Sequence, residues 1–423
     1  MSQQRVPKSR LGRMSRLAFM GVRSGAGMLL GKKDGGAEQA LEALSSLRGL
    51  AMKVGQMASY VDGIVPEEHR EAYGSALRAL QAQAAHSSPA EIRACVQREL
   101  GAPVEELFAE WDDTPIASAS IGQVHRARLP SGEEVAVKVQ HPGVEQALNA
   151  DLDNAGMVET IVGLTTGGRI QSKELFAVVR ERFREELDYT LEAERLAAFT
   201  AVHAGDPAII VPALFPALSS RRVLTTAFAR GLSFEAACAA SAEQRLAWAE
   251  AMWRFVFKAV LTRGLLAADP HPGNYIFQPD GHVVFLDYGC VQRIDDGARE
   301  DALAVHRAAI ARDDAAFADA ARHMVHTKPG ALEPTAIGYV REAFRPLRES
   351  PFRMTRAYAA GLLERMKGMA KQSLTVPERE YFTMPPSMLF VNRLQFGFYS
   401  VLARLDVTVD YARIERAFIE PPP

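Results

Sequence analysis

The sequence is poor in cysteine, and it has no hydrophobic run long enough to cross a membrane. Only three of its 423 residues are cysteines (Cys95, Cys238 and Cys290), and no two of them form a C-x-x-C pair. This pattern argues against a structural zinc site and indicates a reducing compartment. Arg393 interrupts the most apolar segment, residues 385–405, so no stretch reaches the ~18 apolar residues of a transmembrane helix.

The chain also lacks a strong excess of charge of either sign. Its formal net charge is −2 and its composition is 48% hydrophobic and 24% charged, as in ordinary globular proteins of two or three domains. This balance gives no reason to expect a nucleic-acid partner. The N-terminus has no apolar secretory segment with a cleavage site, so we expect a cytoplasmic protein without a transmembrane segment.

Basic residues nevertheless gather at the N-terminus. Residues 1–33 contain eight Lys or Arg and no acidic residue. Two interpretations fit: a solvated, partly disordered tail, or a basic amphipathic segment that contacts anionic lipid at the inner face of the membrane. Residues 1–36 are equally suited to a partner protein.

The order of predicted elements indicates an α+β fold. Helical patterning fills residues 37–85, and a further helix follows the capping box of Ser88 and Glu91. Two strand-like runs, 121–129 and 134–140, are separated by Pro-Ser-Gly and predict a β-hairpin.

Later segments alternate between strand and helix patterns. Residues 221–228 are a strand candidate, and residues 235–266 predict one or two buried helices. The stretch 274–289 predicts a strand–turn–strand unit with Asp-Gly at its turn. Residues 297–418 are mostly helical in pattern.

Two neighbouring motifs indicate phosphoryl-transfer chemistry. Asp269 and Asn274 in "ADPHPGNYIF" have the spacing of a protein-kinase catalytic loop, in which the Asp meets the acceptor hydroxyl and the Asn holds Mg²⁺. A hairpin later, Asp287-Tyr288-Gly289 is a variant of the Asp-Phe-Gly metal motif. A carboxylate and an amide at the hairpin's two ends supply hard oxygen ligands for the Mg²⁺ of a triphosphate. The alternative is that "DPHPGN" is an ordinary turn, because Asp, Pro, Gly and Asn all favour turns. The second motif, one hairpin later, makes this alternative much weaker.

Upstream residues extend the resemblance to a kinase. "VAVK" places Lys138 in the second strand of the predicted hairpin, like the kinase lysine that pairs the α- and β-phosphates. The loop before it, "ASASIGQV", has the register of a glycine-rich phosphate cover, with Gly122 and Val124 at its end. Its first two glycine positions are Ala117 and Ala119, so we expect a stiffer loop. The predicted nucleotide-contacting residues of this loop are Ala117, Ser118, Ala119, Ser120, Ile121, Gly122 and Val124.

An acidic cluster offers a partner for Lys138. In "FREELDYTLEAERLAAF", Glu185, Asp188 and Glu192 lie at i, i+3 and i+7, which places them near one face if the segment is one continuous helix. A solvated acidic face is the alternative for any one of these residues. His271, between two prolines, has two equally weighted roles: a ligand-facing group or a brace for its loop.

Taken together, these motifs resemble the UbiB/ADCK family of atypical protein-kinase-like proteins over roughly residues 40–300. The matching stretches, in order, are "KVGQ", "ASASIGQVH", "VAVK", "ELDY" with the following "EA", "DPHPGN" and "LDYG". The resemblance implies a protein-kinase-like bilobal fold with a helical N-terminal extension packed over the active site. We therefore expect a basic segment at 1–36, the extension at 37–110, an N-lobe with inserted helices at 111–227 and a helical C-lobe at 228–423.

The resemblance also implies roles for single residues. It implies ATP and Mg²⁺ as cofactors, with Asn274 and Asp287 as metal ligands, Asp269 as the catalytic Asp and Lys138 paired with Glu192. Glu186 and Asp188 match the family's E-x-D motif, whose expected partner is the lysine of the K-x-G-Q motif, Lys53. On a helix, Lys53 and Gln56 share a polar strip, which we expect to face the cleft from outside the kinase core.

Function follows from the resemblance in outline only. It implies an atypical kinase or ATPase that supports ubiquinone or other isoprenoid-quinone biosynthesis, or lipid homeostasis, with quinone precursors, anionic lipid or quinone-biosynthesis proteins as partners. An alternative of another class is a nucleotide-binding pseudokinase that gates a lipid or protein partner without turnover. Aminoglycoside- or choline-type kinases share the Asp and Asn but lack the K-x-G-Q segment. This chain departs from the family at Arg195, where an asparagine is usual, and at Tyr288, whose hydroxyl needs a partner if it is buried.

Overall fold

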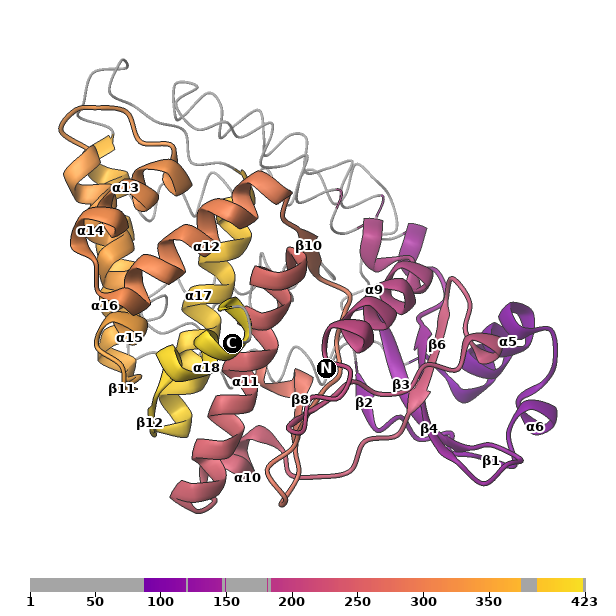
Figure 1. Ribbon diagram of the computed structural model, residues 1–423. Helices are drawn as coiled ribbons and strands as arrows, with labels where there is room; N and C mark the ends of the chain where they lie inside the picture. The colour runs from indigo at the N-terminus through magenta and orange to yellow at the C-terminus, as the bar shows by residue number, and fades with distance from the viewer. Residues whose placement is uncertain are drawn as a thin grey trace, which may run out of the picture.

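The computed structural model describes residues 87–118, 121–146, 149, 181, 184–373 and 386–420. Within these ranges the chain has an α+β fold in two parts (Figure 1). An antiparallel sheet flanked by two short helices forms the smaller part, and a group of helices forms the larger one. Helix α9 (Tyr189–Val202) lies between them, where it contacts both the sheet and the long helix α11 (Ala242–Arg263). The K-x-G-Q segment, with Lys53 and Gln56, and the basic segment 1–36 lie outside the described residues.

The sheet of the smaller part presents Lys138 on the face opposite its hydrophobic core. Its strands are β1 (Glu110–Trp111), β2 (Ala117–Ser118), β3 (Gly122–Arg128), β4 (Glu134–Gln140) and β6 (Val223–Ala227). The order is β1-β3-β4-β6, β2 pairs with β3, and all pairs are antiparallel. Along β4, Val135, Val137 and Val139 are fully buried, so the pleat turns Lys138 to the other side. The predicted hairpin and the strand predicted at 221–228 are confirmed.

Helix α5 (Pro89–Leu100) covers the buried face of this sheet. Ser88 caps the helix by accepting the N–H of Glu91, and the Glu91 carboxylate accepts the N–H of Ser88, so the predicted capping box is confirmed. Ile92 and Val96 of α5 are completely buried against the β4 valines. The short helix α6 (Val104–Leu107) follows.

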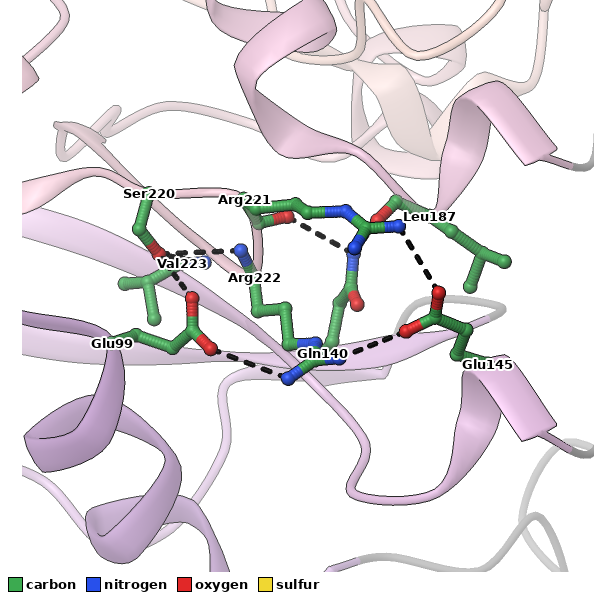
Figure 2. A network of polar contacts seen from close by, with 8 residues as sticks. All are labelled: Glu99, Gln140, Glu145, Leu187, Ser220, Arg221, Arg222 and Val223. Carbon is green, nitrogen blue, oxygen red and sulfur yellow. Dashed lines mark hydrogen bonds and ion pairs between the residues drawn. The ribbon is translucent and has the colours of Figure 1, made fainter.

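Figure 2 shows a polar network that ties the sheet to the segment entering α9. The side-chain amide of Gln140 donates a hydrogen bond of 2.9 Å to the carbonyl of Leu187. Arg222 lies between two carboxylates, Glu99 of α5 at 3.4 Å and Glu145 at 2.8 Å. Because Gln140 is almost fully buried, its hydrogen bond fixes the end of β4 relative to the start of α9.

The larger part is built around α11, whose apolar residues are buried along much of its length. Its other helices are α10 (Phe234–Cys238), α12 (Asp296–Ala311), α13 (Asp314–Val325), α14 (Glu333–Ala343), α15 (Arg345–Arg348), α16 (Arg356–Ser373), α17 (Pro386–Leu405) and α18 (Tyr411–Ile419). Short elements also include β5 (Ile209–Ile210), β11 (Phe352–Arg353), β12 (Thr408–Val409) and the 3₁₀ turn Pro272–Asn274, while the 3₁₀ turn Pro216–Leu218 contacts β6 of the smaller part. The predicted helical patterning is confirmed for most of 235–266, which ends in a short strand, and for most of the described part of 297–418. No helix in the described parts of the chain combines the length and apolar character of a membrane span.

Two pairs of strands, one of which belongs to a three-stranded sheet with β5, hold the catalytic-loop and metal-motif segments side by side. β7 (Leu265–Ala267) pairs with β10 (Val291–Arg293), and β8 (Tyr275–Phe277) pairs with β9 (Val283–Phe285), both antiparallel. Residues 268–274 and 286–290 are therefore bracketed between the two pairs. The N–H of Leu286 donates to the carbonyl of Asn274 at 3.0 Å, which joins the two segments directly.

His203 is a buried imidazole at the junction of α9 and α11. Its ring stacks on Phe199 and Phe255, with centroids 6.1 and 4.8 Å away, and the residue is only 4% exposed. Burial, assisted by the charge of Lys258, lowers the pKa of His203 from 6.5 to about 4. The folded protein therefore keeps this imidazole neutral at a pH where the unfolded chain protonates it.

We expect His203→Leu to make the protein less sensitive to mild acid. Below pH 6.5 the unfolded chain binds a proton that the folded chain takes up only near pH 4, so the wild type loses stability as the pH falls through this window. Between pH 7 and pH 5 this loss is about 2 kcal/mol. Urea unfolding at both pH values should show a correspondingly smaller loss for His203→Leu. Equal losses in the two proteins would contradict the assignment.

Candidate active site

A buried ion pair connects the sheet to α9. The ammonium of Lys138 lies 2.8 Å from both carboxylate oxygens of Glu192, which sits in the first turn of α9 and is 4% exposed. Burial opposes a charged lysine, but the carboxylates of Glu192 and Asp287 outweigh it and raise the pKa of Lys138. Lys138 is thus a fixed cation at every physiological pH, and the predicted pairing with Glu192 is present.

Tyr189 completes the surroundings of this pair, and the sequence argument missed it. Its ring lies 5.0 Å from the Lys138 ammonium, in a cation–π arrangement. Its hydroxyl is buried and has no hydrogen-bond partner in the described parts of the chain. Tyr189 directly follows the E-x-D motif, and an aromatic residue at the start of a buried helix was the signal that could have identified it.

The loop that precedes β3 covers one side of this site. Ala117 and Ser118 form β2, which pairs with Val124 and Gln123 of β3, while Ala119 and Ser120 lie outside the described residues. Gly122 is packed so tightly that a Cβ there would lie 2.4 Å from the carbonyl oxygen of Val139 and 2.9 Å from the Tyr189 hydroxyl. Only glycine fits at this contact, which explains its place in the motif.

The catalytic-loop segment is organised by its own hydrogen bonds. The amide nitrogen of Asn274 donates to the backbone carbonyl of Asp269 at 3.1 Å, which leaves its Oδ1 as the atom suited to a cation. Nδ1 of His271 accepts the N–H of Gly273 at 3.0 Å, and burial lowers the pKa of His271. His271 therefore braces the loop, which is one of its two predicted roles. It also lines the cleft, and contact with a ligand stays a prediction.

The metal-motif segment is fixed just as closely. The Asp287 carboxylate accepts the N–H of Gly289 at 2.8 Å. Tyr288 is fully buried, and its hydroxyl donates to the carbonyl of Phe285 at 3.0 Å, which supplies the partner that the sequence argument required.

The acidic cluster differs from its predicted arrangement. Glu185, Asp188 and Glu192 do not share one helix, because the chain leaves helical geometry at residues 187–188 and α9 begins only at Tyr189. Asp188 has extended backbone angles and caps α9 by accepting the N–H of Thr190 at 2.9 Å. A short acidic side chain before a helical run is a capping signal, and its preference for the N-cap overrode the assumed continuous helix.

Arg195 joins two parts of the site that are distant in sequence. One guanidinium nitrogen lies 2.5 Å from the carboxylate of Glu185, and another donates to the backbone carbonyl of Gly289 at 2.7 Å. The helix that carries Glu192 is thereby attached to the segment that carries Asp287. Sequence reasoning noted Arg195 only as a departure from the usual asparagine, and its spacing of three residues from Glu192 was the available clue.

These side chains surround one cavity of about 340 Å³. Among the predicted site residues, the following line it: Ala117, Ser118, Ile121, Val124, Lys138, Glu186, Glu192, Asp269, Asn274 and Asp287. Gly122 and Asp188 are not part of the wall. Leu286, one of the few large apolar residues left exposed in the described ranges, faces the same cavity as Val124.

The donor chemistry of this cavity suits a hard cation. Asp287 provides a carboxylate and Asn274 an amide oxygen, the ligand types that Mg²⁺ prefers when a phosphate and water supply the rest. Lys138, which comes from the sheet, adds a fixed positive charge to the same cavity. The arrangement can therefore neutralise a polyphosphate from two sides.

Comparison with known proteins identifies a family. Residues 79–321 match the model of the ABC1 atypical kinase-like domain, more than half of the chain. The chain belongs to the ABC1 atypical kinase-like family. This family includes the UbiB/ADCK proteins that the motifs resemble, and both the resemblance and the α+β fold class are confirmed.

Named relatives of this ABC1 chain come from distant organisms. It is 32% identical over 258 residues to "Atypical kinase COQ8, mitochondrial" of Saccharomyces cerevisiae, covering 60% of this chain and 50% of the yeast protein. It is 33% identical over 255 residues to "Protein ACTIVITY OF BC1 COMPLEX KINASE 3, chloroplastic" of Arabidopsis thaliana, covering 59% of this chain and 35% of that protein. The match thus covers only half of the length of the yeast relative, and about a third of the length of the plant relative.

A solved structure is similar over nearly the whole ABC1 chain. The structure of Rv3197 with erythromycin, from Mycobacterium tuberculosis, matches with a TM-score of 0.62 and 28% identity. The match covers 91% of this chain and 97% of the other. Together with the family match, this supports a kinase-like class for the protein.

Proposed function

We propose that this chain is an atypical kinase or ATPase that binds Mg²⁺–ATP in the cleft between the sheet and the helical part. The observation that carries the proposal is the convergence of Lys138, Glu192, Asp269, Asn274 and Asp287 on one cavity. The chain either hydrolyses ATP or transfers its γ-phosphoryl group to a small-molecule or lipid-related acceptor. Positioning and charge neutralisation are the main requirements of this reaction, and the cavity wall offers both.

Each residue has a distinct part in this proposal. Lys138, oriented by Glu192, binds the α- and β-phosphates. Asn274 and Asp287 hold Mg²⁺, which when bound neutralises charge on the phosphates. Asp269 orients the attacking hydroxyl or water and accepts its proton.

Apolar side chains in the same cavity offer a surface on which the nucleotide base can pack. Val124 and Leu286 come from the two different parts of the protein and line the same wall. A flat base inserted between two such side chains is stabilised by burial of apolar surface. The proposal also includes the K-x-G-Q residues, which lie outside the described residues: Lys53 would pair with the E-x-D residues Glu186 and Asp188, and Lys53 and Gln56 would limit access to the cleft.

A role in quinone biosynthesis is proposed by analogy with relatives named COQ8. Under this proposal the acceptor or regulator is an isoprenoid-quinone precursor or an anionic lipid, and quinone-biosynthesis proteins are partners. The protein would work peripherally at the inner face of the membrane. Lipid profiling of a strain that lacks this protein tests the proposed role in quinone biosynthesis. Normal quinone levels in that strain would refute this role.

ATP hydrolysis by the purified full chain tests the central proposal. Phosphate release should be measured with and without anionic liposomes and phenolic quinone-precursor analogues, alongside nucleotide-dependent thermal shift. We expect Mg²⁺-dependent turnover. Nucleotide binding without turnover under every condition would instead support a pseudokinase that gates a partner.

Arg195→Asn is expected to slow turnover more than it weakens nucleotide binding. The substitution removes both contacts that hold Gly289 and Glu185 together, while Lys138, Glu192 and Asp287 keep their own chemistry. We expect kcat to fall about tenfold and the nucleotide Kd to change less than threefold, because loss of positioning affects the transition state most.

Two further variants make the Arg195 test specific. Arg195→Lys can keep only one of the two contacts and should give an intermediate kcat. Arg184→Asn, at an exposed arginine a few residues before α9, should leave kcat unchanged. A Kd loss as large as the kcat loss would show that Arg195 contributes to binding instead.

A further inference from the structure

Tyr189 is a buried residue of the cleft whose hydroxyl makes no hydrogen bond within the described parts of the chain. It is the first residue of α9, it is 1% exposed, and it lines the same cavity as Lys138 and Asp287. Buried hydroxyls nearly always have a partner, because an unpaired one loses its hydrogen bonds to water without replacement. An unpaired hydroxyl in the wall of a cavity therefore points to a ligand that enters the cavity.

The hydroxyl lies on the face of the sheet that carries Lys138. In the pairing of β3 with β4, Gly122 is opposite Gln140 and Val124 is opposite Lys138, so these four positions share one face. A Cβ built on Gly122 would point to this face and lie 2.9 Å from the hydroxyl oxygen of Tyr189. The missing side chain of the glycine thus leaves room for the hydroxyl, at the end of the loop that we expect to cover the phosphates.

The surroundings of this hydroxyl keep it protonated and place a cation beside it. Burial raises the pKa of Tyr189, and the charges of Glu192 and Asp287 act in the same direction. The Lys138 ammonium, 5.0 Å from the ring centre, opposes this rise but does not outweigh it. The hydroxyl is therefore an O–H donor at every physiological pH. A donor next to an ammonium suits an anionic oxygen that both groups can contact.

We propose that Tyr189 binds the nucleotide directly, by donating its hydroxyl to an oxygen of the α- or β-phosphate beside the ammonium of Lys138. This inference rests on the proposed nucleotide site and adds a neutral donor to it. The ring and the hydroxyl then act separately: the ring packs against the ammonium in both states, and the hydroxyl gains a partner only when a phosphate is bound.

The proposal has opposite consequences for the free protein and for the complex. In the free protein the buried hydroxyl destabilises the fold, because it has left water without gaining a partner. In the complex it makes a charge-assisted hydrogen bond, which is stronger than one between neutral groups. Removing the hydroxyl should therefore raise the stability of the free protein and lower its affinity for nucleotides that carry phosphates. A hydroxyl that only supports the fold would lower stability when removed.

Tyr189→Phe in the full chain tests both consequences, since it keeps the ring and removes only the hydroxyl. Without nucleotide, its Tm should be about 2 °C above that of the wild type. Isothermal titration calorimetry should show the Kd of Mg²⁺–ATP and of Mg²⁺–ADP each rising about tenfold, as for the loss of one hydrogen bond to a charged group. The Kd of adenosine, which has no phosphate, should change less than twofold. None of these measurements requires turnover.

Tyr358→Phe is the matched control. Tyr358 of α16 is also buried, but its hydroxyl donates to the carbonyl of Glu342 at 2.6 Å, and it is not part of the cavity wall. This variant should have a lower Tm than the wild type and the same Kd for all three ligands. For Tyr189→Phe, unchanged Kd values for ATP and ADP, an equal loss for adenosine, or a Tm that falls as in the control would each overturn the inference. A wild type that binds neither ATP nor ADP would refute the nucleotide site itself, and the inference with it.

Discussion

Replacing Asp287 with asparagine is expected to abolish the Mg²⁺-dependent part of nucleotide binding. The wild type should show a larger thermal shift with ATP and Mg²⁺ than with ATP and EDTA, and in Asp287→Asn the two shifts should become equal. Asp287 is the one carboxylate that the metal motif brings to the cavity, and the amide that replaces it has no charge to offset that of the cation. Turnover should fall at least a hundredfold, as is typical when a group that stabilises transition-state charge is lost.

The same hairpin provides a matched control for Asp287→Asn. Asp280 lies at its opposite turn, where the carboxylate binds the N–H and ring of His282 on the surface. Asp280→Asn makes the same chemical change far from the cavity, so both the thermal shift and the turnover should match the wild type. An unchanged Mg²⁺-dependent shift in Asp287→Asn would show that the metal assignment is wrong.

Replacing Lys138 with methionine is expected to damage both stability and nucleotide binding. Methionine keeps much of the side-chain volume but leaves the Glu192 carboxylate, buried at 4% exposure, without its cation. Removing one partner of a buried ion pair destabilises proteins by about 3–5 kcal/mol. Urea unfolding should detect this loss, and thermal shift should show no response to ATP.

A double variant separates the two effects of Lys138→Met. When Glu192→Leu is added, the buried carboxylate that lost its cation is removed as well, and most of the stability should return. ATP binding should not return, because the contact to the phosphates is still missing. Recovery of nucleotide binding in the stable double variant would exclude Lys138 as a phosphate ligand.

Structural features that depend only on residues close together in the sequence were predictable. The helix beginning at Pro89 follows from Ser88 and Glu91, whose reciprocal hydrogen bonds involve residues only three apart. The alternating valines of β4 likewise determine which face is buried, and with it the side on which Lys138 lies.

Features that depend on distant contacts were predictable only through the family pattern, or not at all. Lys138 and Glu192 are 54 residues apart, and the residues themselves left several acidic candidates open. The hydrogen bond from Arg195 to the carbonyl of Gly289 joins residues 94 apart in the sequence, and no local sequence pattern predicts it. Asp188 was misplaced because helical spacing was assumed to continue through a residue whose side chain prefers to begin a helix.

The bridge made by Arg195 also limits how the protein can switch. In a kinase-like fold, the helix that carries the Lys partner and the segment that carries the metal ligand can each move between competent and incompetent positions. Here one guanidinium holds both, so moving either one breaks a contact of the other. States in which only one element has moved are then disfavoured, and the two movements merge into a single cooperative transition. A regulator would have to distinguish only two global states, and its strength would be set by its difference in affinity between them.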